Sequence, residues 1–312
     1  MTDFDKDVRQ RFLFEHSDIR GEIISLQESY QSVLSNGTYP APIAHLIGEF
    51  LAGVCLLSAT LKFDGIISLQ ASGTGPLSMI MADCTRQHNV RGVAHYMNTQ
   101  NNETNEASTP PASPTSPPQD KPVQTLTDLL GENATLAVTI DPSKGQRYQG
   151  IIPVEGDTLS ECLTNYFHHS EQLPTRLWVH ANGHRAGGLL LQALPCQLQT
   201  PEEREKHWHH LSQLANTLKP VEQLNFDHTE QLHRLFHQES LRLFTPTDIR
   251  SACSCSRTRT ANMLVSLGLE EAQAILEEKC PIEVTCQFCH QLYSFDQNDI
   301  LCLFKQSPPT LH

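Results

Sequence analysis

The sequence predicts an α+β fold, with an N-terminal domain of antiparallel sheets and packed helices, a helical linker and a small C-terminal module. Short β-branched runs separated by turn residues occupy about the first two hundred residues. A polar, histidine-rich stretch with helical spacing follows, and the end of the chain holds four cysteines in two close pairs. A chain of 312 residues is long enough for one large domain and a smaller one.

These changes in composition predict the domain boundaries. We expect a core domain at residues 1–196, the helical linker at 197–250 and the C-terminal module at 251–312. The core domain carries an insert at residues 98–122, where Asn, Thr, Ser, Glu and Pro dominate. Such a segment cannot bury enough apolar surface to offset its chain entropy, so the insert is expected to be disordered.

The most apolar stretch of the chain, residues 43–61, predicts a core helix. It follows Pro42, and its large apolar side chains repeat at helical spacing. His45 and Glu49 interrupt it and make it a poor bilayer span, so no membrane partner is expected. Before it, the β-branched run Ile19–Leu26 predicts a strand, and residues 28–34 predict a short helix.

Paired strand patterns around Gly, Pro and Asn turns predict three hairpins and one further strand. The hairpins span residues 63–84, 135–154 and 175–194, and the single strand spans residues 90–96. Asp157 is the expected N-cap of a helix that runs to about Ser170. Nothing in the pattern suggests parallel crossovers, so antiparallel pairing is predicted throughout the core domain.

The linker, residues 197–250, predicts amphipathic helices with narrow apolar faces, one of which carries Trp208 and Leu211. Such helices gain most of their stability from the surface on which they pack, so we expect the linker to be conditionally folded. His233 and His237 stand four residues apart and could bind a metal, but no third ligand is evident. A solvated histidine-rich face is the simpler interpretation.

Charge and the N-terminal sequence exclude several classes of function. The net charge of −13 argues against a nucleic-acid partner, because that affinity rests on clustered Lys and Arg. The first residues contain no basic segment followed by an apolar run, so no secretion or transit signal is visible. A cytoplasmic protein is expected.

Four cysteines near the end of the chain have the spacing of a metal site. Cys253 and Cys255 form one pair, and Cys286 and Cys289 form the second after about thirty residues. Two tight thiol pairs are typical of a tetrahedral thiolate zinc site, so we predict one Zn²⁺ per chain on these four residues. Four thiolates leave no open position for water, so the site is expected to be structural or redox-active, and the protein is not expected to be an enzyme.

Oxidation could also join Cys253 to Cys255 and Cys286 to Cys289, each closing a very small loop, whereas a metal closes a loop of about thirty residues. The module has few apolar residues and should depend on its metal. Among the other cysteines, Cys280 lies near the pairs in sequence and is a candidate additional ligand or resolving thiol. Cys55 and Cys162 lie on predicted apolar helical faces, so we expect them to be buried.

The cysteine arrangement occurs together with several other specific motifs. These are Gln146-Arg-Tyr-Gln-Gly150, Glu155-Gly-Asp-Thr-Leu159, Ser170-Glu-Gln-Leu-Pro-Thr-Arg176 after Tyr166-Phe167, and Ala186-Gly-Gly-Leu-Leu-Leu-Gln192. With them, the chain resembles the heat-shock protein 33 family of redox-regulated bacterial chaperones over essentially its whole length except the proline-rich insert. One departure is His290, which stands where a glycine often follows the last cysteine.

The resemblance implies an ATP-independent holdase that is inactive when reduced and zinc-bound. It implies that oxidants form the disulfides Cys253–Cys255 and Cys286–Cys289, expel zinc and unfold the linker. The oxidised form would dimerise and bind unfolding client proteins. The alternative from a different class is a constitutive structural-zinc module for protein or nucleic-acid interaction without a redox switch.

Overall fold

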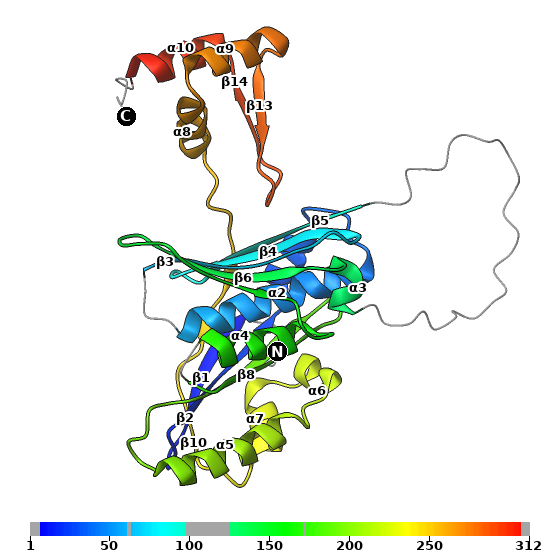
Figure 1. Cartoon of the computed structure of the whole chain (residues 1–312), viewed down its shortest axis with the longest axis vertical. Coiled ribbons are helices and arrows are strands. Elements are labelled where there is room, and N and C mark those ends of the chain that lie inside the picture. Colours follow the sequence, from blue (N-terminus) through cyan, green and yellow to red (C-terminus); the bar gives the residue numbers. More distant parts are fainter. Residues whose placement is uncertain (1–6, 61–63, 98–124, 171–172, 307–312) are drawn as a thin grey trace, which may run out of the picture. The chain divides into compact units, whose positions relative to one another are not determined.

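The computed structural model describes residues 7–60, 64–97, 125–170 and 173–306 (Figure 1). The chain divides into two compact units, residues 1–251 and 252–312, which are described separately. Residues 197–250 belong to the first unit, and their role as a separate linker stays a prediction. The predicted disorder of the insert, residues 98–122, falls outside the described residues.

The first unit contains two six-stranded sheets. In the first sheet the order is β10-β1-β2-β9-β8, with β11 also paired to β1, and every pairing is antiparallel. Its strands are β1 (Val8–Phe14), β2 (Ile19–Leu26), β8 (Thr175–Ala181), β9 (Ala186–Ala193), β10 (Leu241–Leu243) and β11 (Thr247–Asp248). The predicted strand Ile19–Leu26 and the hairpin at 175–194 are confirmed, whereas β1, β10 and β11 were not predicted.

The second sheet has the order β12-β5-β4-β3-β6-β7. Its strands are β3 (Gly65–Ser72), β4 (Leu77–Thr85), β5 (Asn89–Tyr96), β6 (Thr135–Pro142), β7 (Tyr148–Pro153) and β12 (Arg250–Ser251). Both predicted hairpins and the single strand are confirmed. Within residues 1–196 every strand pair is antiparallel, as expected. Outside that range, β12 pairs with β5 in parallel. So short a strand carries no sequence pattern of its own and forms only where the chain passes a sheet edge.

The helix α2 (Ala41–Thr60) packs against both sheets and lies between them (Figure 1). Fourteen of its residues are buried, including Phe50 and Leu51, which confirms the predicted core helix. By length and composition alone α2 could cross a membrane, but 78% of its most apolar window is buried in the first unit. The predicted short helix at 28–34 is α1 (Glu28–Leu34).

Two further helices complete this core, α3 (Leu126–Leu130) and α4 (Leu159–Ser170). The predicted N-cap of α4 was wrong by one residue. The Thr158 hydroxyl accepts a hydrogen bond from the backbone N–H of Glu161, and the Glu161 carboxylate accepts those of Thr158 and Asp157. Asp157 thus donates through its backbone, while Thr158 forms the capping box.

Residues 197–250 form α5 (Pro201–Ala215), α6 (Pro220–Asn225) and α7 (His228–Phe236) before the short strands. A second apolar cluster joins α5 and α7 to the first sheet: Phe236 lies 5.2 Å from Phe14 and 6.3 Å from Phe12 between ring centroids. Trp208 and Leu211 of α5 are buried in this cluster, as expected for helices stabilised by packing.

A layer of buried polar side chains borders this apolar cluster. His228 Nε2 lies 2.9 Å from the Ser25 hydroxyl, and its Nδ1 lies 3.4 Å from Gln10 Oε1. Gln223 donates to the Trp178 carbonyl oxygen at 3.0 Å. At the start of the segment, the buried Asp18 carboxylate accepts backbone N–H groups of residues 197–199. The linker residues therefore dock through specific hydrogen bonds as well as apolar contact.

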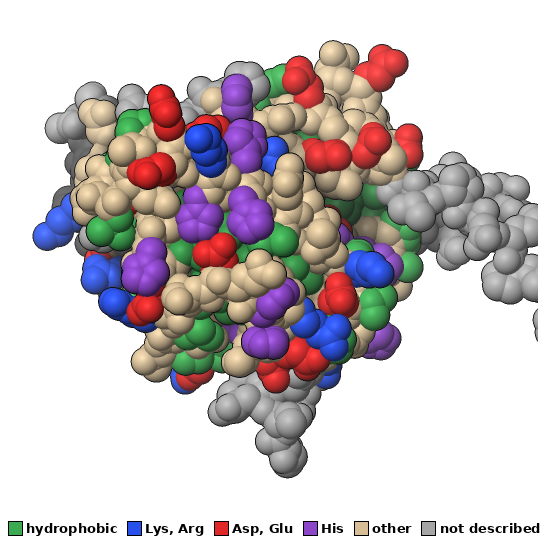
Figure 2. Space-filling view, turned by 90° about the horizontal axis from the view of Figure 1, so that it is seen from below, with side chains coloured by type: hydrophobic (Ala, Val, Ile, Leu, Met, Phe, Trp, Pro, Cys, Tyr) green, Lys and Arg blue, Asp and Glu red, His purple; other side chains and the backbone are tan. Residues whose placement is uncertain are grey.

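Histidine and acidic side chains gather on the face of the first unit shown in Figure 2. His207 Nε2 contacts the Glu239 carboxylate at 3.2 Å, and His209 contacts Glu205 at 3.1 Å. The rings of His233 and His237 lie 6.2 Å apart, and no third ligand joins them among the described residues. These residues fit a solvated face better than a metal site.

The contact of α7 with the first sheet predicts a large effect of truncating Phe236. Phe236→Ala removes a ring that is 1% exposed and leaves a cavity between Phe12 and Phe14. We expect it to lower the free energy of unfolding of the first unit by about 3–5 kcal/mol in urea titrations followed by tryptophan fluorescence. Val221→Ala, at a side chain that is 69% exposed, should change it by no more than about 0.5 kcal/mol. Equal effects would contradict this account of the docking.

The burial of His228 predicts a loss of stability in acid. Burial lowers the pKa of His228 from 6.5 to about 4, against the smaller, opposite effect of the Asp227 charge. The unfolded chain therefore binds a proton before the folded one, so stability falls as the pH drops from about 6.5 to about 4, by up to roughly 3 kcal/mol. His228→Gln, which stays neutral, should lack this part of the pH dependence in urea unfolding at pH 7 and pH 4.5. An unchanged pH dependence in the variant would refute the assignment.

Candidate metal centre

The second unit is a small module, and the core of its described part, residues 252–306, has six buried apolar residues. It contains α8 (Arg257–Leu267), α9 (Leu269–Glu278), β13 (Ile282–Thr285), β14 (Leu292–Phe295) and α10 (Gln297–Gln306). Gly268 separates α8 from α9, and the Asp296 carboxylate accepts the backbone N–H of Asp299 at the start of α10. Its buried side chains are Ala261, Leu264, Ala272, Ile282, Phe295 and Ile300.

Local structure places one cysteine pair on each of two segments. Cys253 and Cys255 precede α8, which begins after Ser256, whose hydroxyl accepts the N–H of Arg259 at 3.2 Å. Cys286 and Cys289 lie in the turn between β13 and β14, which the hydrogen bond from His290 N–H to the Cys286 carbonyl oxygen closes at 2.9 Å.

His290 completes the turn with a positive φ of 56°. This left-handed conformation favours glycine, which explains why a glycine is the residue expected after the last cysteine. The histidine keeps the same turn at some cost in backbone energy.

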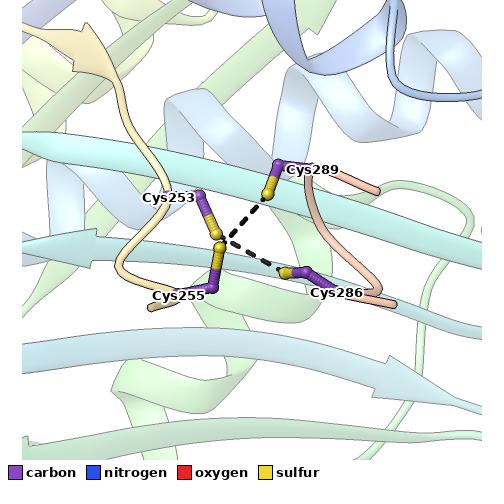
Figure 3. A group of neighbouring side chains, drawn as sticks. All are labelled: Cys253, Cys255, Cys286 and Cys289. Atoms are coloured by element: carbon purple, nitrogen blue, oxygen red, sulfur yellow. Dashed lines mark hydrogen bonds between the residues drawn. The ribbon is translucent and has the colours of Figure 1, made fainter. Parts of the chain in front are cut away.

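The four sulfur atoms converge on one point. All lie within 4.8 Å of one another, and Figure 3 shows the two pairs facing each other. The distance from Cys253 Sγ to Cys286 Sγ is 3.6 Å and that from Cys255 Sγ to Cys289 Sγ is 3.4 Å. Sulfur atoms bound tetrahedrally to zinc at about 2.3 Å stand roughly 3.8 Å apart, so this donor set fits a four-thiolate zinc ion.

Hydrogen bonds and burial control the protonation of this group. In the metal-free protein, burial and the three neighbouring thiols raise the pKa of Cys289 to about 12. The Tyr293 hydroxyl donates to Cys255 Sγ at 3.2 Å, and this bond raises the pKa of Tyr293 to about 12. Zinc binds thiolates, so metal binding at this site must release protons.

Sequence reasoning missed Tyr293 as a neighbour of the thiols. The pairing of Val284 with Tyr293 in the β13–β14 ladder brings this side chain toward the thiols. A tyrosine shortly after the second cysteine pair is too weak a signal to reveal the contact without the strand register.

The other cysteines lie outside the four-thiol group. Cys280 is exposed and does not join it, so the structure gives no support to Cys280 as a ligand. Cys55 and Cys162 are buried, as predicted, and Cys84 is buried with them. Cys196 and Cys302 are exposed.

The fold and the four-thiol module define a class, an α+β protein with an appended metal-binding unit, and comparisons with known proteins identify the family. The family model described as Hsp33 protein matches residues 7–296. The chain therefore belongs to the Hsp33 family.

Relatives from two pseudomonads match nearly the whole chain. A 33 kDa chaperonin of Pseudomonas fluorescens is 48% identical over 307 residues, which cover 97% of this chain and 96% of the relative. A 33 kDa chaperonin of Pseudomonas aeruginosa is 47% identical over 300 residues, covering 96% and 94%.

A solved structure supports the fold. The 33 kDa chaperonin of Thermotoga maritima superposes with a TM-score of 0.74 at 20% identity and covers 96% of this chain and 98% of its own. The predicted α+β architecture is thus shared with a solved member of the family.

The ligand assignment predicts the outcome of removing one thiol. Cys286→Ser should abolish zinc binding and unfold residues 252–306, because structural zinc supplies on the order of 10 kcal/mol to modules of this size. Metal analysis should give less than one zinc per chain, and hydrogen exchange should show loss of protection in β13 and β14.

The matched control is Cys280→Ser, whose exposed thiol lies outside the group. It should keep one zinc per chain and normal protection. A fully loaded, protected Cys286→Ser protein would reject the ligand set.

Proposed function

We propose that this chain is a redox-regulated, ATP-independent chaperone, a holdase that binds unfolding proteins under oxidative stress. The observation that carries the proposal is the convergence of two close thiol pairs on a module with a very small core. Membership of a family whose relatives are named chaperonins supports the chaperone class. A cytoplasmic location agrees with thiols that must stay reduced until an oxidant appears.

Zinc would be held by Cys253, Cys255, Cys286 and Cys289, one ion per chain. When bound, it ties the segment before α8 to the turn between β13 and β14. Tyr293 orients Cys255 by its hydrogen bond, and the turn closed by His290 holds Cys286 beside Cys289. The protein side chains thus present two thiol pairs that are each close enough in sequence to react internally.

Oxidation would convert each pair to a disulfide, Cys253–Cys255 and Cys286–Cys289. Each pair gives two electrons and two protons to one hydrogen peroxide, which leaves as two waters. A disulfide sulfur carries no negative charge, so each oxidised pair withdraws two metal ligands. Both new bonds are local, and neither replaces the tie across about thirty residues.

Loss of that tie leaves the module with too little core to stay folded. The change would pass to residues 197–250 through the chain itself, because only Ala252 separates β12 from Cys253. Helices α5 and α7 cover the apolar surface around Phe12 and Phe14. Their release would expose apolar side chains on both partners, for unfolded clients and for a homodimer.

A constitutive zinc module for interaction with protein or nucleic acid is the second candidate. Residues 251–304 carry three Lys or Arg and seven Asp or Glu, which opposes binding to phosphate backbones. No observation on the module favours this candidate over the redox switch.

The proposal predicts that oxidation switches the activity. Reduced, zinc-loaded protein should leave the aggregation of a heat-denatured client unchanged, whereas protein treated with peroxide at elevated temperature should suppress it without ATP. Light scattering measures aggregation, and a chromogenic chelator should record about one zinc released per chain over the same period.

Two variants separate the cause from side effects. Cys280→Ser should behave like the parent protein, and the double variant Cys253→Ser, Cys286→Ser should suppress aggregation with or without oxidant. Equal suppression by the reduced and oxidised parent would refute the switch, and activation without zinc release would refute the mechanism.

A further inference from the structure

The Tyr293 hydroxyl reaches the four thiols from the strand that follows the second cysteine pair. It donates a hydrogen bond to Cys255 Sγ at 3.2 Å. Tyr293 and Phe295 stand two residues apart on β14, so their side chains leave the same face of the strand. Phe295 is 1% exposed in the core of the module, and the half-buried ring of Tyr293 packs against that core. The core therefore holds the ring in place while its hydroxyl contacts one sulfur.

This hydrogen bond joins the same two segments that a metal ion would join. Cys255 lies before α8, and Tyr293, 38 residues further on, lies in the hairpin of β13 and β14. Tyr293 pairs with Val284 across that hairpin, which fixes its distance along the strand from the turn that carries Cys286 and Cys289. A residue from the segment of the second cysteine pair thus donates to a sulfur of the first pair.

Other contacts also hold Cys255 in position. Arg259 of α8 donates to the Ser254 carbonyl oxygen at 3.1 Å and to the Ser254 hydroxyl at 2.8 Å. The backbone N–H of Arg259 donates to the Ser256 hydroxyl, so the first turn of α8 is tied to the residues on both sides of Cys255. Loss of the Tyr293 hydroxyl alone should therefore leave the sulfur near its place, and the consequence should be chemical.

The hydrogen bond acts on the electrons that an oxidant attacks. A thiolate reacts with a peroxide through a lone pair on sulfur, and an interaction that stabilises the thiolate lowers its intrinsic nucleophilicity. Four thiolates around one Zn²⁺ also leave the site negatively charged, and a donor hydrogen bond offsets part of that charge. A hydroxyl that donates to Cys255 should thus slow its oxidation and favour retention of the metal.

We propose that the Tyr293 hydroxyl sets the oxidant threshold of the switch, by lowering the reactivity of Cys255 toward peroxide and strengthening the binding of zinc. The inference rests on the proposed function and adds a residue that controls how much oxidant the switch needs. Tyr293 acts through Cys255 and is therefore a positioning residue, which keeps its own proton throughout.

The oxidation that Tyr293 slows has two steps. One sulfur of the pair takes an oxygen from hydrogen peroxide as the O–O bond breaks, which gives a sulfenic acid and hydroxide. The other sulfur displaces a second hydroxide and forms the bond between Cys253 and Cys255. Two electrons pass to the peroxide, and both hydroxides become water with protons from the solvent. Cys255 reacts in one step or the other, so the hydrogen bond slows the pair by either order of attack.

The test compares zinc release by hydrogen peroxide from the reduced, zinc-loaded parent and Tyr293→Phe, recorded with a chromogenic chelator. Removing the hydroxyl should speed release by about three- to tenfold. It should also raise the dissociation constant for zinc by about tenfold in competition with a chelator of known affinity. Tyr148→Phe, at an exposed tyrosine of the first unit, is the matched control and should behave like the parent. Equal release from Tyr293→Phe and the parent would overturn the inference.

Cobalt-loaded protein separates a hydrogen bond from a packing effect. Co²⁺ bound to thiolates absorbs by charge transfer from sulfur to metal, and a sulfur that loses a hydrogen bond gives up its electrons more easily. The band of Tyr293→Phe should therefore shift to longer wavelength, while hydrogen exchange in β13 and β14 stays as in the parent. An unshifted band with lost protection would mean that the tyrosine only fills space, which would reject the role.

Replacing Tyr293 with 3-fluorotyrosine tests the effect in the opposite direction, and it serves if Tyr293→Phe does not bind metal. The fluorinated phenol keeps the ring and is a stronger donor, so zinc release should be slower than from the parent. Release as fast as from the parent, or faster, would contradict the role of the hydroxyl. A parent that releases no zinc in peroxide would refute the proposed function itself, whereas equal release from parent and variants would reject the role of Tyr293 alone.

Discussion

Four sulfur atoms from two segments about thirty residues apart share one small volume, and the second unit has little else to hold those segments together. Its six buried apolar residues are mostly small or aliphatic, with Phe295 as the one large ring among them. Arg257 stacks over that ring at 4.3 Å and pairs with Asp299 at 2.7 Å, but both contacts are partly solvated. Coordination at the thiols would therefore set whether this unit is folded, and any chemistry that removes thiolates acts on the fold directly.

The first unit has a much larger apolar core than the second. Helix α2 fills the space between two sheets, and its buried side chains belong to a large apolar cluster. Residues 197–250 add a second apolar cluster on the other face of the first sheet, bordered by His228, Gln223 and Asp18. Hydrogen bonds in such a layer favour one docked arrangement of these residues. If one hydrogen-bond partner moves away, the buried polar group that stays behind is unsatisfied and destabilises the docked state. A docked segment of this kind is stable while all its contacts are present, and we expect it to undock from the sheet cooperatively.

Patterns that depend on local periodicity were visible in the sequence, and those that depend on a partner were not. The helix α2, the three hairpins and the strand β5 follow from spacing and turn residues. Strand β1 was missed because Arg9 and Arg11 interrupt its apolar run. The partners of these arginines, Glu22 and acceptor oxygens of α2, lie far from them in sequence or on the next strand. The cysteine pairs predicted the convergence of four thiols, whereas the contact of Tyr293 with Cys255 required the strand register.

Oxidation at the candidate metal centre would act on the fold of the second unit directly. The new disulfides would be local, so the connection across about thirty residues would be lost and the unit would loosen. The first unit has its own apolar core around α2, between the two sheets, which this change does not touch. For a holdase this arrangement has a physical advantage, because the sheet that must present apolar surface would stay folded while the segments that cover it are released.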